Sequence, residues 1–350
     1  MKKLKYLILL VLISFTLSAC SITFNPTTTM TITSKRTYTG STISYSVPNP
    51  NNPDGYQVIF DFGDGNKITT NTNKSNHVIK PDDPTKNFAY FVGWYYNNEL
   101  FDFNKSINSD IILTARWEYD YESLVNYIYK NTIKSCIKVE TYAYTNGFIR
   151  QSYSDSIGSG VIFDEDDNYY YALTNNHVVY YDSSKYKNVE YHIYDCYSNV
   201  YGDPQEDSTL RSELIGNKPE YDLALLKFTK GSKTLEVAKM ANSSESYKVF
   251  SLGNPKSLTN AISFGEITGT KTFTPKEETK DKSNVSFDVL THSSELNNGS
   301  SGGGLFNFNL ELVGINFASS VSTSDEFIRG YTIPIEKVKE FINIYKNKSS

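Results

Sequence analysis

The chain has 350 residues, with 34 Lys or Arg against 39 Asp or Glu, which gives a formal net charge of −5 at pH 7. Its basic residues are scattered along the sequence, and this argues against a nucleic-acid-binding protein. No Cys/His cluster has the spacing of a metal site, and no glycine motif follows a strand as in a nucleotide site. We therefore expect no metal and no cofactor.

Residues 1–19 have the pattern of an export signal: lysines precede an apolar run over residues 6–17 that is too short to span a bilayer comfortably. The run ends in Leu17-Ser18-Ala19-Cys20, which resembles a bacterial lipobox. That resemblance implies cleavage before Cys20, lipidation of its thiol, and anchoring at the outer face of the cytoplasmic membrane or the cell surface. A signal peptide of another type with a chance cysteine is the alternative.

Residues 20–54 are rich in Thr, Ser, Asn and Pro, which predicts a solvated tether. A weak alternation from Thr42 to Val47 leaves open a strand of the next domain.

Residues 55–119 differ in sequence pattern from the preceding segment. Apolar and polar residues alternate over Tyr56–Phe62 as in a strand, and the turn residues Gly63-Asp64-Gly65 follow. The region resembles a single internalin B-repeat (Listeria–Bacteroides repeat), a small β-grasp-like domain of bacterial surface proteins. Its tryptophans, Trp94 and Trp117, are the only two in the chain, and we expect them to form its core. The resemblance implies a spacing or adhesive role, with a surface ligand that the sequence does not identify.

The segment Gly299-Ser300-Ser301-Gly302-Gly303-Gly304 surrounds a hydroxyl with residues that let a substrate approach the main chain closely. If Ser301 is a nucleophile, the N–H groups of Gly299 and Ser301 form an oxyanion hole. A flexible Gly/Ser loop is the alternative for this segment alone.

Two upstream segments supply partners for such a serine. His177 ends the run Leu173-Thr174-Asn175-Asn176-His177, and Asp222 precedes Leu223-Ala224-Leu225-Leu226. Both resemble the catalytic segments of the HtrA (Deg) family of trypsin-like serine proteases. The order His177, Asp222, Ser301 is that of chymotrypsin-like enzymes and differs from the order in subtilisins and α/β-hydrolases. We therefore predict a serine endopeptidase.

The resemblance extends over residues 121–346 and implies a mostly β fold, a chymotrypsin-like double β-barrel over 120–350 preceded by the small repeat domain. Further matching segments are Ile157–Phe163, Val249–Pro255, Leu312–Phe317 and Gly330–Ile335. By the same resemblance Ile315, Asn316 and Phe317 pair with bound polypeptide substrate. No PDZ-like segment follows, so chaperone function is not expected.

The glycine segment departs from the family pattern at two positions. Ser300 stands where Asn or Asp is common, and this fits an enzyme that needs no cleaved N-terminus for activation. Gly304 stands where Pro is usual, and we expect this change to loosen the loop. The rival hypothesis is an inactive protease-like surface lipoprotein that acts as an adhesin or binding module.

Specificity and cysteine pairing stay open at this stage. Glu295 lies six residues before Ser301, a position from which a carboxylate favours Lys or Arg before the scissile bond, although an exposed loop glutamate is the alternative. With Cys20 lipidated, Cys136 and Cys196 either form a disulfide or are small buried thiols.

Two amphipathic helices are predicted beside the barrels. The first covers residues 120–134, with Asp120 as its cap and with Leu124 and Ile128 on its apolar face, and we expect it on the outside of the first barrel. The second covers residues 336–345. The charged stretch 271–283 is predicted to be a solvated loop.

Overall fold

A computed structural model describes residues 21–22, 47, 52–63, 65–145, 156–244, 248–254, 260–274 and 277–346. The expected signal peptide, Cys20 and most of the expected tether lie outside the described residues. In the part of the chain that the structure describes, no helix is long and apolar enough to cross a membrane.

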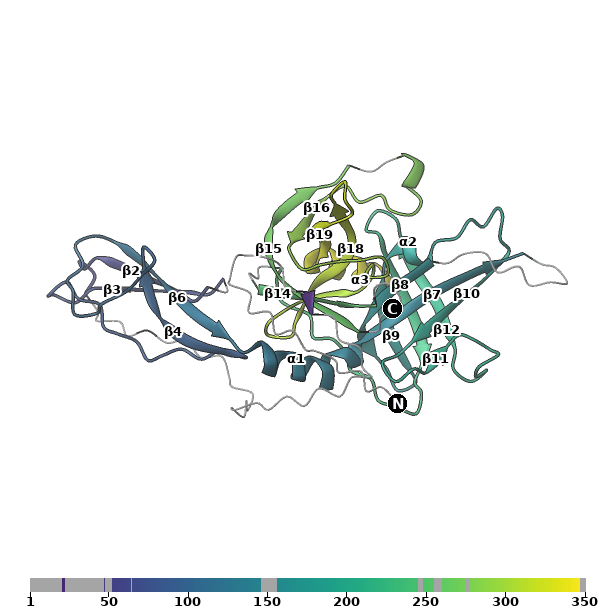
Figure 1. Cartoon of the computed structure of the whole chain (residues 1–350), viewed down its shortest axis with the longest axis horizontal. Helices are drawn as coiled ribbons and strands as arrows, with labels where there is room; N and C mark the ends of the chain where they lie inside the picture. Colours follow the sequence, from purple (N-terminus) through teal and green to yellow (C-terminus); the bar gives the residue numbers. More distant parts are fainter. Residues whose placement is uncertain are drawn as a thin grey trace, which may run out of the picture.

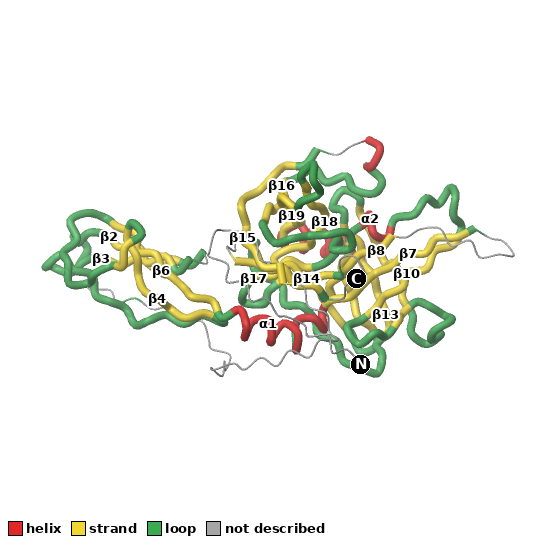
Figure 2. Tube along the Cα trace, viewed as in Figure 1, coloured by secondary structure: helices red, strands yellow, loops and turns green. Residues whose placement is uncertain are grey.

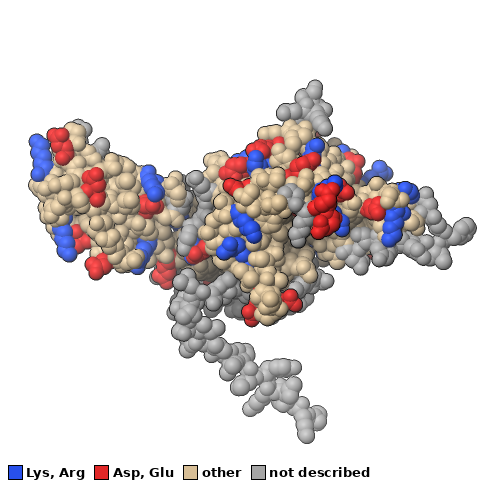
Figure 3. Space-filling view, turned by 90° about the horizontal axis from the view of Figure 1, so that it is seen from above, with Lys and Arg blue, Asp and Glu red and all other residues tan. Residues whose placement is uncertain are grey.

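The chain forms three β-sheets in sequence order: a small N-terminal domain and two larger sheets that pack together (Figure 1). Strands dominate throughout (Figure 2). Acidic and basic side chains are interspersed over the face of the molecule seen in Figure 3.

The N-terminal domain is a five-stranded mixed sheet in the order β3-β2-β6-β4-β5, in which β2 and β6 run parallel. Its strands are β2 (Gln57–Asp61), β3 (Lys67–Asn71), β4 (Ala89–Tyr96), β5 (Glu99–Leu100) and β6 (Ile111–Tyr119).

Trp94 forms the centre of this domain's core, as predicted. Its side chain is 2% exposed, and its ring makes edge contacts with Phe60 at 4.6 Å and Phe62 at 5.2 Å between centroids. Trp117 packs against the same cluster while only half-buried, and its indole N–H donates to the Phe62 carbonyl at 2.9 Å.

The second sheet is the first barrel, with strand order β11-β10-β7-β8-β9-β13-β12. Its two ends meet where the Ser212 hydroxyl donates to the Tyr191 carbonyl and the Gly202 N–H donates to the Leu210 carbonyl. Its elements are β7 (Cys136–Tyr144), β8 (Ser156–Glu165), β9 (Tyr169–Thr174), α2 (Asn176–Val179), β10 (Asn188–Tyr194), β11 (Val200–Tyr201), β12 (Ser212–Lys218) and β13 (Leu223–Thr229).

The third sheet is a closed barrel, because β15 pairs with β16 as well as with β14. Around the barrel the order is β14-β15-β16-β19-β18-β17, and the first barrel repeats this connectivity with β7-β8-β9-β13-β12-β10. The mostly β, double-barrel prediction is confirmed. The strands are β14 (Lys248–Gly253), β15 (Ala261–Thr272), β16 (Asp288–His292), β17 (Gly304–Asn307), β18 (Leu312–Val321) and β19 (Phe327–Pro334).

Two short segments differ from the sequence expectations. Ser21 and Ile22, which fall in the expected tether, form β1 (Ser21–Ile22) and pair with Ser263 and Ile262 of β15. The charged stretch 271–283 is largely exposed over its described residues, as expected, but it contains the end of β15 and the 3₁₀ turn η3 (Glu277–Thr279). After it, the Asn284 N–H donates to the Pro219 carbonyl of the first barrel.

The first long helix, α1 (Tyr121–Lys130), begins where predicted, because Asp120 Oδ1 accepts from the Ser123 N–H at 3.0 Å. It is shorter than predicted and is followed by the 3₁₀ turn η1 (Thr132–Ser135). Its buried residues join a cluster that contains side chains of the first barrel, against which we expected the helix, and also side chains of the second barrel. The buried helix residues are Leu124, Val125 and Ile128.

The last helix, α3 (Ile335–Lys346), is confirmed, and its buried face includes Val338, Phe341 and Ile342. It reaches back to the first barrel, where the Tyr345 hydroxyl donates to the Asn217 carbonyl at 2.9 Å. The C-terminus therefore ties the two barrels together.

The N-terminal domain meets the second barrel through aromatic rings. Phe308, in the turn between β17 and β18, packs edge-on against Tyr119 at 5.0 Å and Tyr121 at 5.8 Å. Phe264 of β15 contacts Phe308 and Tyr121 from the barrel side. One buried phenylalanine therefore joins β6, α1 and the second barrel.

We expect Phe308→Ala to lower the free energy of unfolding by about 3–5 kcal/mol, because it leaves a cavity among four aromatic neighbours. Urea unfolding followed by fluorescence measures this loss. Tyr197→Ala is the matched control, since Tyr197 is 43% exposed. Equal midpoints for the two variants would contradict the role assigned to Phe308.

Candidate catalytic site

The three predicted residues come from three separate connections. His177 lies on α2, directly after β9, and Asp222 directly precedes β13. Because β9 and β13 are antiparallel neighbours with Thr174 opposite Ala224, the end of one strand and the start of the other lie at the same edge of the sheet. Ser301 comes from the second barrel, between β16 and β17.

Asp222 and His177 are in direct contact. Asp222 Oδ2 lies 2.8 Å from His177 Nδ1, and Oδ1 accepts from the His177 N–H at 3.0 Å. The carboxylate is fully buried, and the residue has a left-handed φ of 49°. Asn175 Nδ2 donates to the Asp222 carbonyl at 2.9 Å and holds this uncommon backbone in place. The pair therefore fixes the orientation of the imidazole.

The serine loop is brought to this pair by β8. The Ser159 N–H donates to the Ser301 carbonyl at 2.7 Å. A Cβ on Gly158 would lie 2.6 Å from Val178, next to His177, and 2.9 Å from the Ser301 carbonyl. Gly158 therefore lies between the histidine segment and the serine segment, and because it has no side chain the two segments can both pack closely against it. Among the hydrogen bonds of the described residues, none links Ser301 Oγ to His177, and such contacts often tighten only when substrate is bound.

Backbone donors in the glycine loop alternate between bonded and open. The N–H groups of Ser300, Gly302 and Gly303 donate to Asn297, Asn316 and Ser300 carbonyls at 2.8, 2.8 and 3.0 Å. The N–H groups of Gly299 and Ser301 have no acceptor in the described part of the chain. These are the two donors predicted for an oxyanion hole.

Ser159 braces this loop, and the sequence analysis did not single it out. Its hydroxyl donates to the Gly299 carbonyl at 2.7 Å and accepts from the Asn254 N–H at 2.8 Å. Thr174 Oγ1 donates to the Ser159 carbonyl at 2.7 Å, which connects the same residue to the end of β9. The signal was present in the matching segment Ile157–Phe163, whose central serine lies between two glycines.

The two departures from the family pattern have structural accounts. Ser300 Oγ accepts from the Asn297 N–H at 3.1 Å and is itself 6% exposed, so it closes the loop internally. Gly304 is a paired strand residue, and a Cβ there would lie 2.3 Å from the Phe306 ring. The missing Pro therefore makes room for a core phenylalanine, and this packing opposes the loosening that we expected.

The predicted substrate strand needs a correction. Ile315 lies between β17 and β19, opposite Gly304 and Ile333. Asn316 pairs with the glycine loop, since its N–H donates to the Gly303 carbonyl and its carbonyl accepts from the Gly302 N–H. On the side of β18 away from β19, no described strand pairs beyond Asn316, so the open edge begins at Phe317 and continues through residues 318–321.

Glu295 lies in the loop before the glycine segment, and its carboxylate accepts from Asn297 Nδ2 at 2.9 Å. Its backbone is fixed on both sides, because its N–H donates to Ser263 Oγ and its carbonyl accepts from Ser251 Oγ. The side chain is half-buried and engaged within its own loop.

A buried polar chain supports the loop from behind. Thr332 Oγ1 donates to Asn316 Oδ1 at 2.6 Å and lies 3.0 Å from His292 Nε2, and all three side chains are at most 1% exposed. Burial lowers the pKa of His292 to about 4, and this effect exceeds the opposing contributions from the Ser294 backbone and the Asn316 side chain. Gly330 accommodates the imidazole, since a Cβ there would lie 2.2 Å from the ring.

The loop after η3 also contributes to the site. Asn176, beside His177, donates through Nδ2 to the Asp281 and Lys282 carbonyls at 3.0 and 2.8 Å. A charged segment of the second barrel thus holds the helix that carries the histidine.

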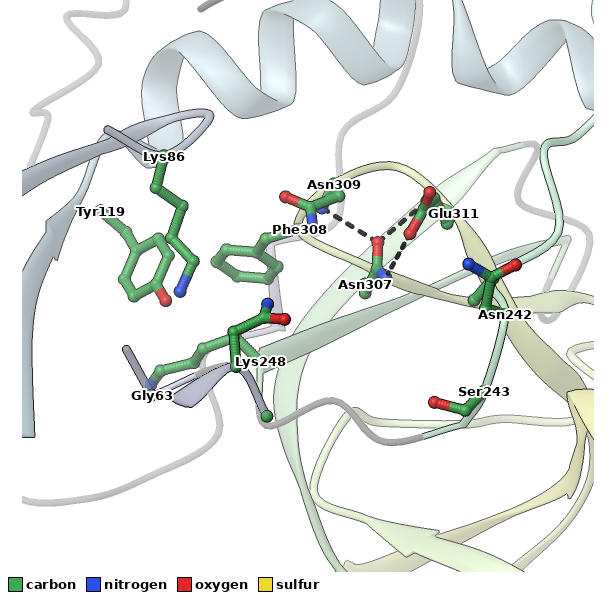
Figure 4. A pocket seen from close by; sticks show the side chains of 13 residues that line it. Gly63, Lys86, Tyr119, Asn242, Ser243, Lys248, Asn307, Phe308, Asn309 and Glu311 are labelled. Atoms are coloured by element: carbon green, nitrogen blue, oxygen red, sulfur yellow. Dashed lines mark hydrogen bonds between the residues drawn. The ribbon is translucent and has the colours of Figure 1, made fainter. Parts of the chain in front are cut away.

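Within the described ranges, no group of three or more His, Cys, Asp or Glu could hold a metal ion. A polar pocket of about 250 Å³ lies at the junction of the N-terminal domain and the second barrel (Figure 4). Lys86 and Tyr119 line it from one side, and the hydrogen-bonded Asn307–Glu311 turn lines it from the other. None of the three predicted catalytic residues lines this pocket.

We expect stability to fall as the pH drops from about 6.5 towards 4. The folded-state pKa of His292 lies below the unfolded value, so the unfolded chain binds the extra proton first, and the loss reaches about 3 kcal/mol at pH 4. Urea midpoints measured between pH 7 and pH 4.5 for the parent and His292→Gln test this. His77→Gln, in the other domain, is the control. An unchanged pH slope in His292→Gln would contradict the assignment.

Comparison with known proteins agrees with this geometry. Residues 158–315 match the model of the trypsin-like peptidase domain, and residues 56–116 match that of the Listeria-Bacteroides repeat domain. The periplasmic serine endoprotease DegP of Escherichia coli K12 is 29% identical over 198 residues, which cover 55% of this chain and 36% of DegP. The serine protease Do-like HtrB of Bacillus subtilis is 29% identical over 140 residues, 39% of this chain and 30% of HtrB.

The chain thus spans about a third of the length of these curated relatives. Among solved structures, the active form of the protease Rv3671c from M. tuberculosis superposes with a TM-score of 0.46 at 18% identity, over 62% of this chain and 83% of that one. The chain therefore combines a Listeria–Bacteroides repeat domain with a trypsin-like peptidase domain whose relatives are serine proteases.

Proposed function

We propose that this chain is a membrane-anchored, extracytoplasmic serine endopeptidase that uses His177, Asp222 and Ser301. The observation that carries the proposal is the 2.8 Å contact between the buried Asp222 carboxylate and His177 Nδ1 beside a serine loop with two open backbone donors. A base oriented by a carboxylate, next to a serine and an anion-binding pair, is the arrangement that acyl transfer requires.

In the first step Ser301 Oγ attacks the peptide carbonyl while His177 Nε2 accepts its proton. His177 then protonates the leaving amine, and an acyl-enzyme forms on Ser301. In the second step His177 deprotonates a water molecule that attacks this ester. His177 then returns the proton to Ser301 Oγ as the ester bond breaks, which releases the new carboxyl end and restores the serine. Asp222 holds the Nδ1–H tautomer throughout and stabilises the imidazolium.

The N–H groups of Gly299 and Ser301 bind the developing oxyanion, at roughly 3 kcal/mol for each donor. The contribution of these N–H groups to the rate depends on their orientation, because a donor stabilises the oxyanion fully only if it already points at the oxygen before the reaction. Ser159 supplies this rigidity by accepting from Asn254 and donating to the Gly299 carbonyl.

The substrate is a polypeptide in an extended conformation. The open edge of β18, from Phe317 onward, offers backbone groups for one added antiparallel strand, the mode in which main-chain hydrogen bonds supply affinity. Unfolded segments and flexible loops fit this requirement better than helices.

The proposed location outside the cytoplasm rests on the export signal and on the lipobox-like segment ending at Cys20. The name of the DegP relative, a periplasmic endoprotease, agrees with it. Lipidation of Cys20 would hold the enzyme at a membrane surface, and the repeat domain would then bind a surface ligand or space the barrels from their anchor.

The test is labelling of the chain by a fluorophosphonate, which reacts with activated serines. We expect the parent to label and Ser301→Ala to stay unlabelled with an unchanged fold by circular dichroism. Asp222→Asn should reduce peptide hydrolysis by about 10⁴-fold, because the imidazole then takes the wrong tautomer. A folded parent that does not label would reject the proposal and favour the inactive, adhesive alternative.

The brace at Ser159 yields a separate prediction. Ser159→Ala removes one hydrogen bond to the Gly299 carbonyl and one acceptor for Asn254, so we expect the rate of labelling to fall roughly 10- to 100-fold, equivalent to about 1.4–2.8 kcal/mol. Ser156→Ala, at the start of the same strand, is the matched control and should label like the parent. Parent-like labelling of Ser159→Ala would show that the loop holds its shape without this brace.

A further inference from the structure

We propose that the polar pocket between the repeat domain and the second barrel binds one sugar residue of a neutral saccharide. The pocket has a volume of about 250 Å³, and both domains line it (Figure 4). The inference gives a location to the surface ligand proposed for the repeat domain, and it rests on that part of the proposed function. It does not depend on whether the serine site is active.

One wall of the pocket is a rigid turn of the second barrel, between β17 and β18. Asn307 Oδ1 accepts from the N–H groups of Asn309 and Glu311 at 3.0 and 2.9 Å, and the Asn307 N–H donates to the Glu311 carbonyl at 2.9 Å. The Asn309 side chain makes no hydrogen bond within the described part of the chain. The turn therefore presents a free amide at the pocket on a fixed backbone.

The loop before β14 forms the open side of the pocket. Lys339 Nζ of α3 donates to the Ala241 carbonyl at 2.6 Å and to the Asn242 carbonyl at 3.3 Å, which holds the backbone of this loop. The Asn242 amide and the Ser243 hydroxyl are exposed, and the described residues supply no hydrogen bond to either. In Figure 4 the Ser243 hydroxyl points toward the side of the pocket on which Lys248 lies.

The charged side chains of the barrel wall already have partners of opposite charge. Lys248 forms an ion pair with Glu266, and Glu311 forms one with Lys239 at 2.6 Å. A charged ligand would have to compete with these pairs for the same groups. The barrel wall therefore favours a neutral ligand that uses the amides and the hydroxyl.

The opposite wall comes from the repeat domain. Lys86 is only 5% exposed, and its ammonium lies 4.9 Å from the centre of the Trp117 ring, in a cation–π contact. Beside it, the half-buried Tyr119 packs edge-on against Phe308, with the ring centroids 5.0 Å apart. Figure 4 shows the Lys86 amine next to the Tyr119 ring. This wall adds aromatic surface to the polar groups of the barrel.

A sugar residue matches this combination of groups. Amide and hydroxyl side chains both donate and accept hydrogen bonds, as each hydroxyl of a sugar ring does. The Tyr119 ring offers an apolar surface to the C–H face of the same sugar. The volume lies just below the ~300–1,000 Å³ of pockets for drug-sized ligands, so one sugar residue fits. The rest of a saccharide chain would leave through the opening at Ser243.

A ligand in this pocket touches both domains at once. Tyr119 ends β6 of the repeat domain, whereas Ser243 and Asn309 belong to loops of the second barrel. Because hydrogen bonds already fix the barrel loops, binding costs little ordering of the protein. A ligand that binds only the assembled junction also stabilises it.

The experiment is saturation-transfer NMR on the whole folded chain with the methyl glycosides of glucose, galactose, mannose and N-acetylglucosamine as probes. We expect at least one probe to bind with a Kd of about 0.1–10 mM, the range for a ligand of this size. At tenfold excess over its Kd, that probe should raise the melting temperature by about 2–4 °C. No saturation transfer from the folded parent to any probe would overturn the proposal.

The double variant Ser243→Ala with Asn309→Ala removes two of the free polar groups and should weaken binding at least tenfold. Neither side chain makes a hydrogen bond in the described ranges, so the variant should fold with the urea midpoint of the parent. Ser208→Ala, which changes an exposed serine of the first barrel, is the matched control and should bind like the parent.

Two results with these variants would overturn the assignment. Affinity equal to that of the parent in the double variant would place the sugar elsewhere, and displacement of the sugar by phosphate would identify an anion site. Fluorophosphonate labelling of the double variant should match that of the parent. A loss of sugar binding is therefore distinguished from a failure of the proposed serine chemistry.

Discussion

The site depends on the binding of the glycine loop of the second barrel to strand β8 of the first. Two hydrogen bonds carry this contact, from the Ser159 N–H to the Ser301 carbonyl and from its hydroxyl to the Gly299 carbonyl. The same hydroxyl accepts from the Asn254 N–H, directly after β14. Without these bonds the serine loop would lose its direct link to the strand beside the histidine segment. The bare backbones of Gly158 and Gly302 make this close approach possible, since a Cβ at either position would overlap the opposite segment.

The same contact explains why two backbone donors stay open. Ser159 and Asn316 donate hydrogen bonds to the carbonyls of this loop and so fix its backbone. The N–H groups of Gly299 and Ser301 therefore cannot rotate to find an acceptor within the loop. The buried chain Asn316–Thr332–His292 supports the loop from the opposite side. Holding polar groups in place before the reaction costs folding stability, and the lowered pKa of the buried His292 shows one part of that cost.

The remaining elements keep the two barrels in register with each other. The helix α1 packs at their junction, α3 returns from the second barrel to the first, and the loop after η3 holds Asn176 beside the histidine. The repeat domain joins this assembly through Phe308 and its aromatic neighbours, on a part of the second barrel that does not include the serine loop. The contacts of the repeat domain with the second barrel therefore lie apart from the serine loop.

The order and local sequence of His177, Asp222 and Ser301 were enough to predict the fold class, and they singled out the residues that we propose as triad and oxyanion donors, because such chemistry needs those residue types on short turns beside strands. The cap of α1 and the apolar faces of α1 and α3 were also readable from the sequence, since helix periodicity is local. The open edge beginning at Phe317, the bracing role of Ser159 and the place of Gly304 beneath Phe306 were not. Each of these depends on which strands lie opposite each other, and strand register is decided by contacts between residues far apart in the chain.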